Sequence, residues 1–320
     1  MIASFLIQTL NGLASASLLF LVALGLTLIF GVTRVVNFAH GSFFMVGAYL
    51  AVTFYDRLGG GVLGFWGGAI LASAVVGVLG AVIEIVILRR IYRAPELLQL
   101  ITTFGVVLVL KDAVLYLWGP EDILGPRAPG LTGAVSILGK PFPEYDLLLL
   151  ALGPLLGLGV WLLLKRTDWG TRVRAATEDR DMAAALGINQ ALMFTGVFVL
   201  GSMLAGLAGA LALPREPANH AMDLTIIADV FVVTVVGGLG SLPGAYVAAV
   251  IISVVKAWCI GLGDTAVFGV TFSFSKLTLV AEFIVMAVVL VIRPWGLFGT
   301  PQAPQRICAA PGHSRLWRLC

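Results

Sequence analysis

The sequence predicts an all-α fold, a polytopic bundle of eight or nine transmembrane helices in which some helices are broken or re-entrant. Two observations lead to this prediction. Of the 320 residues, 59% are hydrophobic and only 12% are charged, whereas soluble domains carry about 25% charged residues. The hydrophobic residues also form runs of about the 20 residues that a helix needs to cross a bilayer. So few charges would not cover a water-facing surface.

The first four apolar runs follow closely on one another. The first is interrupted by Arg34 and Asn37, and the second resumes almost without a loop. The third ends at a basic cluster of Arg89, Arg90 and Arg93, and the fourth ends at a polar stretch rich in proline and glycine. Each run is long enough for one span, and the four cover residues 5–32, 38–55, 62–88 and 97–118.

The remaining four runs include one long run. The fifth precedes a charged segment, 165–189, and the sixth follows it. The seventh is longer than one span requires, and a glycine-containing stretch separates it from the eighth. These runs cover residues 147–164, 191–213, 224–255 and 277–292.

Basic residues predict the orientation, because cytoplasmic loops of membrane proteins are enriched in Lys and Arg. Segments 89–93 and 165–180 are both basic and two runs lie between them, so both are predicted to be cytoplasmic. The N-terminus and the loop 119–145 are then outside. The arginines after Ile292 place the tail in the cytoplasm. That requires a re-entrant segment or a ninth crossing, for which 254–274 is apolar enough.

Residues 1–299 are predicted to form one transmembrane domain, and the tail 300–320 to be disordered. Three widely spaced cysteines, Cys259, Cys308 and Cys320, support neither a disulfide framework nor a zinc site, and no cofactor is predicted. The net charge of +3 gives no indication of a nucleic-acid partner. Because no basic residue precedes Arg34, the first segment lacks the positive region of a secretory signal and is predicted to be a retained helix.

The segment 25–41 breaks a membrane helix with polar residues and glycine. A broken helix exposes backbone N–H and C=O groups, which survive in a membrane only when they are buried in protein or line a wet path. Asn37, His40 and Gly41 are therefore candidates for contacting a transported solute or for holding a kink. The alternative is a tight cytoplasmic turn capped by Asn37, and the sequence favours neither.

A second break lies in the other half of the chain, at 235–244. Its glycines include Gly237, Gly238 and Gly240, and a proline follows them. Paired interruptions in the two halves of a membrane protein are typical of a transport pathway, so these glycines are also candidates for a pathway. The alternative is a plain bend or a surface turn.

The charged segment 172–189 predicts a short helix between two spans. Residues 175–186 are mostly good helix formers, and Gly187 is a natural C-terminal stop. Such a helix, charged on one side, suits docking into a partner, although an ordinary solvated helix has the same pattern. The candidate docking residues are Ala175, Glu178, Asp179, Met182, Ala183 and Gly187.

Ionisable residues also lie inside apolar runs. Glu84 is close enough to Arg89 to pair with it. Glu282 precedes Arg293 by eleven residues, or about 16 Å of helix. That depth places it near the bilayer centre, where a charge is expensive and is usually functional or buried between helices. No Gly-x-x-x-x-Gly-Lys-Ser/Thr motif occurs, so any ATP is hydrolysed by another chain.

Five ordered motifs together resemble the branched-chain amino acid ABC permease family of the LivH type. They are Gly-Leu-Thr-Leu-Ile-Phe-Gly (25–31) with Asn-Phe-Ala-His-Gly (37–41), Glu84 with its basic cluster and Thr-Thr-Phe-Gly (102–105), the segment 178–189, Gly-Gly-Leu-Gly-Ser-Leu-Pro-Gly (237–244), and Arg-Pro-Trp-Gly-Leu-Phe-Gly (293–299). The resemblance covers about residues 5–299, and the tail lies outside it.

The resemblance implies a multi-pass protein of the bacterial inner membrane that is not an enzyme. It implies a pathway formed with a second, homologous permease subunit. Cytoplasmic ATPase subunits would dock on the helix at 175–189, and a periplasmic binding protein would deliver the solute. That solute would be a branched-chain amino acid or a related amino acid.

Two other functions are weighed against this one. In an ion-coupled secondary transporter of small polar solutes, Glu282 would be the coupling carboxylate. A membrane-embedded enzyme would need a cluster of His, Asp or Glu residues at one depth, and none is apparent in the sequence.

Overall fold

The computed structural model describes residues 2–92, 94–137, 139–178, 180–267 and 270–299. Within these ranges the chain is mainly helical, as predicted. The tail 300–320, which was expected to be disordered, lies outside the described residues, and so does Asp179.

The helices follow the predicted apolar runs closely, with ends that differ by a few residues. A π-helix, Glu84–Leu88, joins α3 to α4, and a short 3-10 helix, Phe274–Leu277, precedes α12. The helices are α1 Ile2–Thr33, α2 Ala39–Arg57, α3 Gly61–Ile83, α4 Arg89–Ile91, α5 Glu96–Trp118, α6 Glu144–Arg166, α7 Asp168–Glu178, α8 Arg180–Ala185, α9 Gln190–Ala212, α10 Met222–Gly237, α11 Leu242–Leu262 and α12 Thr278–Ile292.

The all-α prediction needs one correction, because the structure contains two β-hairpins. Strands β1 (Ala134–Ile137) and β2 (Lys140–Pro143) pair antiparallel, and so do β3 (Asp264–Val267) and β4 (Val270–Ser273). Each hairpin connects two long helices. Pairing between strands satisfies backbone groups that leave the helical pattern where the chain turns back.

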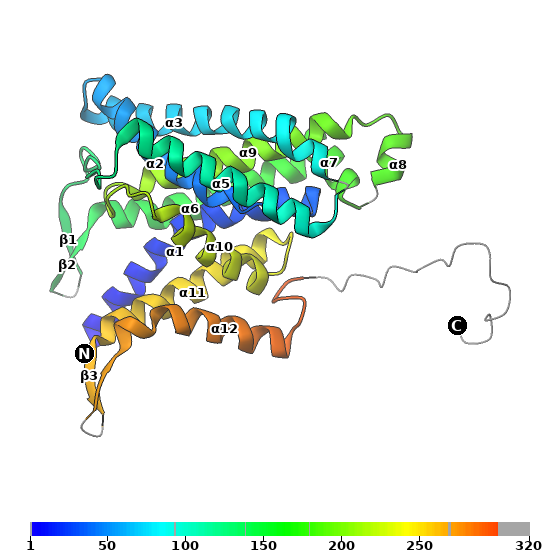
Figure 1. Ribbon diagram of the computed structural model, residues 1–320. Coiled ribbons are helices and arrows are strands. Elements are labelled where there is room, and N and C mark those ends of the chain that lie inside the picture. The colour runs from blue at the N-terminus through cyan, green and yellow to red at the C-terminus, as the bar shows by residue number, and fades with distance from the viewer. Residues whose placement is uncertain (1, 93, 138, 179, 268–269, 300–320) are drawn as a thin grey trace, which may run out of the picture.

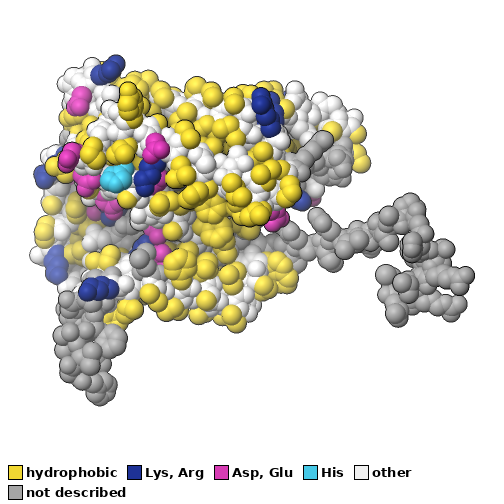
Figure 2. Space-filling view, in the orientation of Figure 1, with side chains coloured by type: hydrophobic (Ala, Val, Ile, Leu, Met, Phe, Trp, Pro, Cys, Tyr) yellow, Lys and Arg dark blue, Asp and Glu magenta, His cyan; other side chains and the backbone are white. Residues whose placement is uncertain are grey.

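Six of the helices are long and apolar enough to cross a membrane, namely α1, α3, α5, α6, α9 and α11. A shorter apolar stretch, Val280–Ile292, lies in α12. Hydrophobic side chains cover most of the face shown in Figure 2, as expected for helices that face lipid or other membrane subunits. The chain is therefore a helical membrane protein.

The long seventh run is divided into two helices, α10 and α11, by a turn at residues 238–241. Gly238 and Gly240 have φ of 99° and 89°, values that disfavour any side chain with a Cβ. Ser241 then caps α11 by accepting a hydrogen bond from Gly244 N at 3.2 Å, and a proline lies in the first turn. The expectation of a crossing at 254–274 is wrong, because α11 ends at Leu262 and a hairpin follows.

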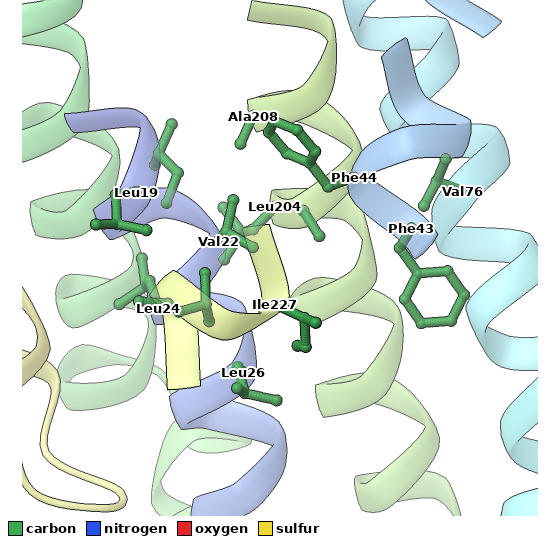
Figure 3. Packing of buried hydrophobic residues seen from close by; sticks show 14 of the residues in the cluster. Leu19, Val22, Leu24, Leu26, Phe43, Phe44, Val76, Leu204, Ala208 and Ile227 are labelled. Atoms are coloured by element: carbon green, nitrogen blue, oxygen red, sulfur yellow. The ribbon is translucent and has the colours of Figure 1, made fainter. Parts of the chain in front are cut away.

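The bundle has two distinct ends. The N-terminus, the β1–β2 hairpin and β3 gather at one end, which we call the hairpin end, and α7 and α8 lie at the opposite end (Figure 1). Helix α1 runs through the middle of the bundle and packs on α6, α9, α10 and α11. Figure 3 shows buried side chains of α1, α2, α3, α9 and α10 meeting in this core, among them Val22, Phe43, Leu204 and Ile227.

Glycines allow α2, α3 and α9 to pack with their backbones in close contact. A Cβ added at Gly47 would lie 2.4 Å from the Cα of Gly206, and one at Gly209 would reach the backbone carbonyl of Phe44. Membrane helices rely on such close approach, because burial of apolar surface does not favour association in lipid. The small residues of α9 that the sequence spaces four apart therefore form its contact face.

A buried carboxylate ties the end of α3 to the start of α9. Glu84 is fully buried, and its carboxylate pairs with Arg89 at 3.0 Å. It also accepts hydrogen bonds from Thr195 at 2.7 Å and from Tyr92 at 3.2 Å. The pairing of Glu84 with Arg89 is the one that the sequence predicted, whereas the bond to Thr195 depends on the tertiary fold.

Candidate functional site

The break after α1 turns the chain back into the bundle. Arg34 adopts φ of 57°, and a short non-helical segment leads to the start of α2 at Ala39. There, His40 Nε2 donates to the backbone carbonyl of Val22 at 3.0 Å. Val22 precedes the end of α1 at Thr33 by eleven residues, or about 16 Å of helix. Helix α2 therefore begins partway along α1, inside the bundle.

The residues predicted at this break are buried and hold it in place. The Asn37 side chain accepts a hydrogen bond from Ala39 N at 3.1 Å, a turn bond that leads the chain into the buried start of α2. His40 is fully buried against Gly25, where an added Cβ would lie 3.0 Å from its ring. Gly41 contacts α10, because an added Cβ would lie 2.3 Å from the Asp223 carbonyl oxygen. These contacts place the break inside the bundle.

A cavity with a volume of about 590 Å³ lies in the hairpin half of the bundle. The early part of α1, the segment before α10, α10 itself and the later part of α11 surround it. Glu216 and Ile260 are exposed, so the cavity reaches the surface. Its polar lining residues are Gln8, Asn11, Ser15, Arg215, Glu216, Asn219, Thr225, Asp229, Ser253 and Lys256, and its apolar ones include Leu18, Leu19, Phe44, Met222 and Ile226.

One wall of the cavity carries an ammonium group shared by two carboxylates. Lys256 Nζ lies 2.6 Å from Asp229 Oδ2 and 3.1 Å from Glu282 Oε2. The three residues come from α10, α11 and α12. Asp229 and Lys256 line the cavity, whereas Glu282 is fully buried behind them. This wall therefore holds one more negative group than positive groups.

A second charged pair joins Arg215, on the segment between α9 and α10, to Asp146 of α6. Arg215 Nε lies 3.4 Å from Asp146 Oδ1, and its Nη2 donates to Ser15 Oγ at 2.9 Å. This guanidinium connects α6 and α1 and faces the cavity. The cavity thus presents a cation and an anion from two separate clusters.

Apolar side chains close the space between the cavity and the α7–α8 end. A much smaller space there, of about 10 Å³, is lined by Leu26, Phe30, Val36, Phe231, Thr234 and Leu239. That volume is about the least that holds one water. Val36 of the α1–α2 break lines this inner space, and Phe44 of α2 lines the cavity.

The glycines at 237–240 form a tight turn whose backbone contacts the segment 293–299 that follows α12. Leu297 N donates to Val236 O at 2.8 Å, and Phe298 N donates to Gly237 O at 3.1 Å. A Cβ at Gly238 would lie 2.5 Å from Gly299 N. The lining residues of the two spaces do not include Gly237, Gly238 or Gly240. Locally, these glycines permit the turn and the backbone contact.

The predicted docking segment is helical on both sides of Asp179, which lies outside the described residues. Helix α7 begins at Asp168, earlier than predicted, because Thr167 Oγ1 accepts from Gly170 N at 3.1 Å and caps it. Helix α7 ends at Glu178, and α8 runs from Arg180 to Ala185. Gly187 follows with φ of 79°, as expected of a C-terminal stop. Residues 175–178 and 180–185 are thus helical, as the sequence predicts for this segment.

The surface of α7 and α8 combines charge with exposed apolar side chains. Glu178 and Met182 are exposed, Ala175 is half-buried and Ala183 is buried. Leu186 is 74% exposed. The Arg174 guanidinium donates to the carbonyl of Leu164 and holds α7 against the end of α6.

The structure brings together fewer of the predicted residues than expected. Glu282 joins the cavity wall through Lys256, whereas the residues that line the cavity do not include Asn37, His40 or Gly41. Sequence reasoning missed Arg215, Asp229 and Lys256 as site residues. Asp229 and Lys256 are ionisable residues inside apolar runs, a signal that marks functional positions in membrane proteins.

Helical spans, a helix break and a charged cavity within the bundle define a membrane transport protein. A family model described as "Branched-chain amino acid transport system / permease component" matches residues 8–292. The chain belongs to this family and is the permease subunit of an ATP-binding-cassette importer.

Curated relatives of the chain span nearly its whole length. It is 29% identical over 307 residues to the high-affinity branched-chain amino acid transport system permease protein BraD of Pseudomonas aeruginosa, covering 93% of this chain and 97% of BraD. It is 27% identical to the corresponding LivH protein of Escherichia coli, covering 93% and 96%. It is 25% identical to LivM of Salmonella typhimurium, covering 76% and 61%.

Proposed function

We propose that this permease carries branched-chain or related amino acids across the bacterial inner membrane, together with a second permease subunit and separate ATPase subunits. The match to a permease family over residues 8–292 is the main support for this proposal. The names of BraD and LivH support the substrate class, and the similarity to LivM supports a homologous second permease.

The proposed pathway begins in the charged cavity and continues past the α1–α2 break. Asn37, His40 and Gly41, which are buried at this break, would shape the pathway, and Glu282 backs the cavity wall. Gly237, Gly238 and Gly240 let the α10–α11 turn pack on residues 297–299. ATP binding by the partner would shift the permease between conformations through contacts that differ between them.

The two ends of the bundle are proposed to receive different partners. The hairpin end, where the cavity reaches the surface, would face a periplasmic solute-binding protein. The α7–α8 end would face the cytoplasm and the ATPase. The basic residues of segments 89–93 and 165–180 support this orientation, because such residues remain cytoplasmic.

We further propose nine crossings, formed by the six long helices with α2, α10 and α12. An odd number places the N-terminus outside and Arg293 in the cytoplasm, in agreement with the basic residues. The shortness of α10 and α12, which have 16 and 15 residues, is compatible with crossings that start within the bundle.

Single cysteines placed in a variant without native cysteines should test this topology. With nine crossings, Leu124→Cys and Leu262→Cys react with a membrane-impermeant maleimide added outside intact cells. Leu186→Cys, Leu239→Cys and Trp295→Cys react only after the membrane is permeabilised. Reaction of Trp295→Cys from outside would support eight crossings instead.

Leu186→Asp should abolish docking of the ATPase and uptake. Leu186, which follows α8, and Glu178, which ends α7, are both exposed and suit an interface that combines an apolar contact with charge, in which a buried aspartate at 186 would lack a partner. The test reconstitutes the chain with candidate ATPase and second permease subunits, and measures co-purification of the ATPase and ATP-dependent leucine uptake. Charge reversal at Glu178 and Asp179 is expected to weaken both.

The matched control is Leu124→Asp, because Leu124, on the segment between α5 and β1, is 83% exposed. It should leave ATPase co-purification unchanged. If Leu186→Asp and the charge reversal leave assembly and uptake intact, the docking role is wrong. Uptake that persists without ATP and collapses with the proton or sodium gradient would favour the ion-coupled transporter, with Glu282 as coupling carboxylate.

A further inference from the structure

We propose that the cavity itself binds the zwitterionic head of an amino acid, with the α-ammonium group at Asp229 and the α-carboxylate at Arg215. This inference rests on the proposed function and adds to it a binding site within the permease. Selection of the solute would then not be left to a binding protein alone.

The charge of the Lys256 cluster leaves room for a further cation. One ammonium group faces two carboxylates, those of Asp229 and Glu282. Asp229 Oδ2 is occupied by Lys256, but its Oδ1 is buried and has no hydrogen-bond partner among the described residues. Of the two carboxylates, only Asp229 lines the cavity. An unsatisfied acceptor of this kind is costly to bury unless a donor reaches it, and a ligand ammonium supplies that donor.

The group that would bind the α-carboxylate of the ligand is Arg215, from the other charged pair. Arg215 has five N–H donors, and its described contacts are a long one to Asp146 at 3.4 Å and one to Ser15 at 2.9 Å. Lys256 is less suitable for binding the carboxylate of the ligand, because it is already paired with the carboxylates of Asp229 and Glu282. A guanidinium is well matched to a carboxylate, since it offers parallel N–H groups.

The rest of the cavity suits a short apolar side chain. Leu18, Leu19, Phe44, Met222 and Ile226 line it in addition to the polar groups. Its volume of about 590 Å³ leaves space for a small amino acid with water. Small-molecule sites commonly combine apolar walls with a few polar groups that set orientation.

Three probes separate the two halves of the proposed site. L-leucine carries both charges, L-leucinamide carries the ammonium group alone, and 4-methylpentanoate carries the carboxylate alone. Binding to the purified full-length chain in lipid nanodiscs is measured by saturation-transfer NMR titration. Asp229→Asn should weaken the binding of leucine and leucinamide by about ten- to hundredfold and leave the binding of 4-methylpentanoate unchanged. Arg215→Gln should weaken the binding of leucine and 4-methylpentanoate and leave the binding of leucinamide unchanged.

The control variants are Asp56→Asn and Arg57→Gln, an exposed acid and base at the end of α2 that do not line the cavity. They should leave the affinity for all three probes unchanged. If an Asp229 or Arg215 variant does not fold, the wild-type chain still tests the proposal. It should bind leucine more tightly than leucinamide or 4-methylpentanoate, which carry one charged group each.

Equal binding of leucine and 4-methylpentanoate by the wild-type chain would overturn the ammonium site. Equal loss of all probes in both variants would overturn the assignment of the two groups. If no probe binds while the assembled transporter takes up leucine with ATP, the cavity site is wrong and the proposed function stands. Failure of ATP-dependent uptake, with the zwitterion preference intact, would contradict the function instead.

Discussion

Gly47→Leu should abolish the folded protein, and Gly47→Ala should destabilise it markedly. A Cβ at Gly47 would lie 2.3 Å from the Gly206 carbonyl oxygen and 2.4 Å from the Gly206 Cα. These are backbone atoms of α9, which do not move aside as a flexible side chain does, so α2 and α9 must separate. Overpacking typically costs about 1–3 kcal/mol, and a leucine exceeds that because it cannot fit between the helices.

Thermal unfolding of the detergent-purified protein, together with the yield of its monodisperse fraction, measures this effect. The matched control is Gly105→Ala in α5, where nothing lies within 4 Å of an added Cβ. Because alanine favours a helix over glycine by about 1 kcal/mol, the control should be neutral or stabilising. An unchanged melting temperature for Gly47→Ala would contradict the close packing of α2 on α9.

Lys256→Met should destabilise the bundle and abolish uptake. The change leaves Asp229 and Glu282 without their shared ammonium group, and Glu282 is fully buried. Removing one partner from a buried ion pair costs about 3–5 kcal/mol, because it leaves an uncompensated charge. Thermal unfolding and ATP-dependent leucine uptake by the assembled transporter are the two measurements.

A rescue variant distinguishes charge from packing. Lys256→Met combined with Asp229→Asn and Glu282→Gln removes all three charges and should recover most of the lost stability without recovering uptake. Lys140→Met is the matched control, because Lys140 is exposed on the β1–β2 hairpin. If the combined variant stays as unstable as Lys256→Met, the instability comes from lost packing and not from unpaired carboxylates.

Several parts of the structure were predictable because they depend on local sequence. Apolar runs predicted the long helices, and Gly187 ended α8 as expected, since a positive φ is a property of that single position. The break at Asn37 was also predictable, because polar residues and glycine interrupt a membrane helix wherever it sits. The pairing of Glu84 with Arg89 spans only five residues.

Other features were not predictable from single runs. The glycines and proline at 235–244 predicted a break in the seventh run, but not the contact that Gly238 makes with residues 295–299. The expected crossing at 254–274 failed because hydropathy does not show where a helix ends. The β-hairpins likewise depend on how long helices are connected at one end.

The sequence by itself determined that this chain is a helical membrane protein, where its helices break, and to which family of permeases it belongs. Composition, run length and ordered motifs are local properties, so they are readable without the fold. Only the tertiary structure decided that α2 starts beside Val22 and that Asp229, Lys256 and Glu282 meet at one cavity wall. Those contacts join residues from separate helices. In lipid, backbone fit between small residues sets how helices pack, and hydrophobicity alone does not specify it.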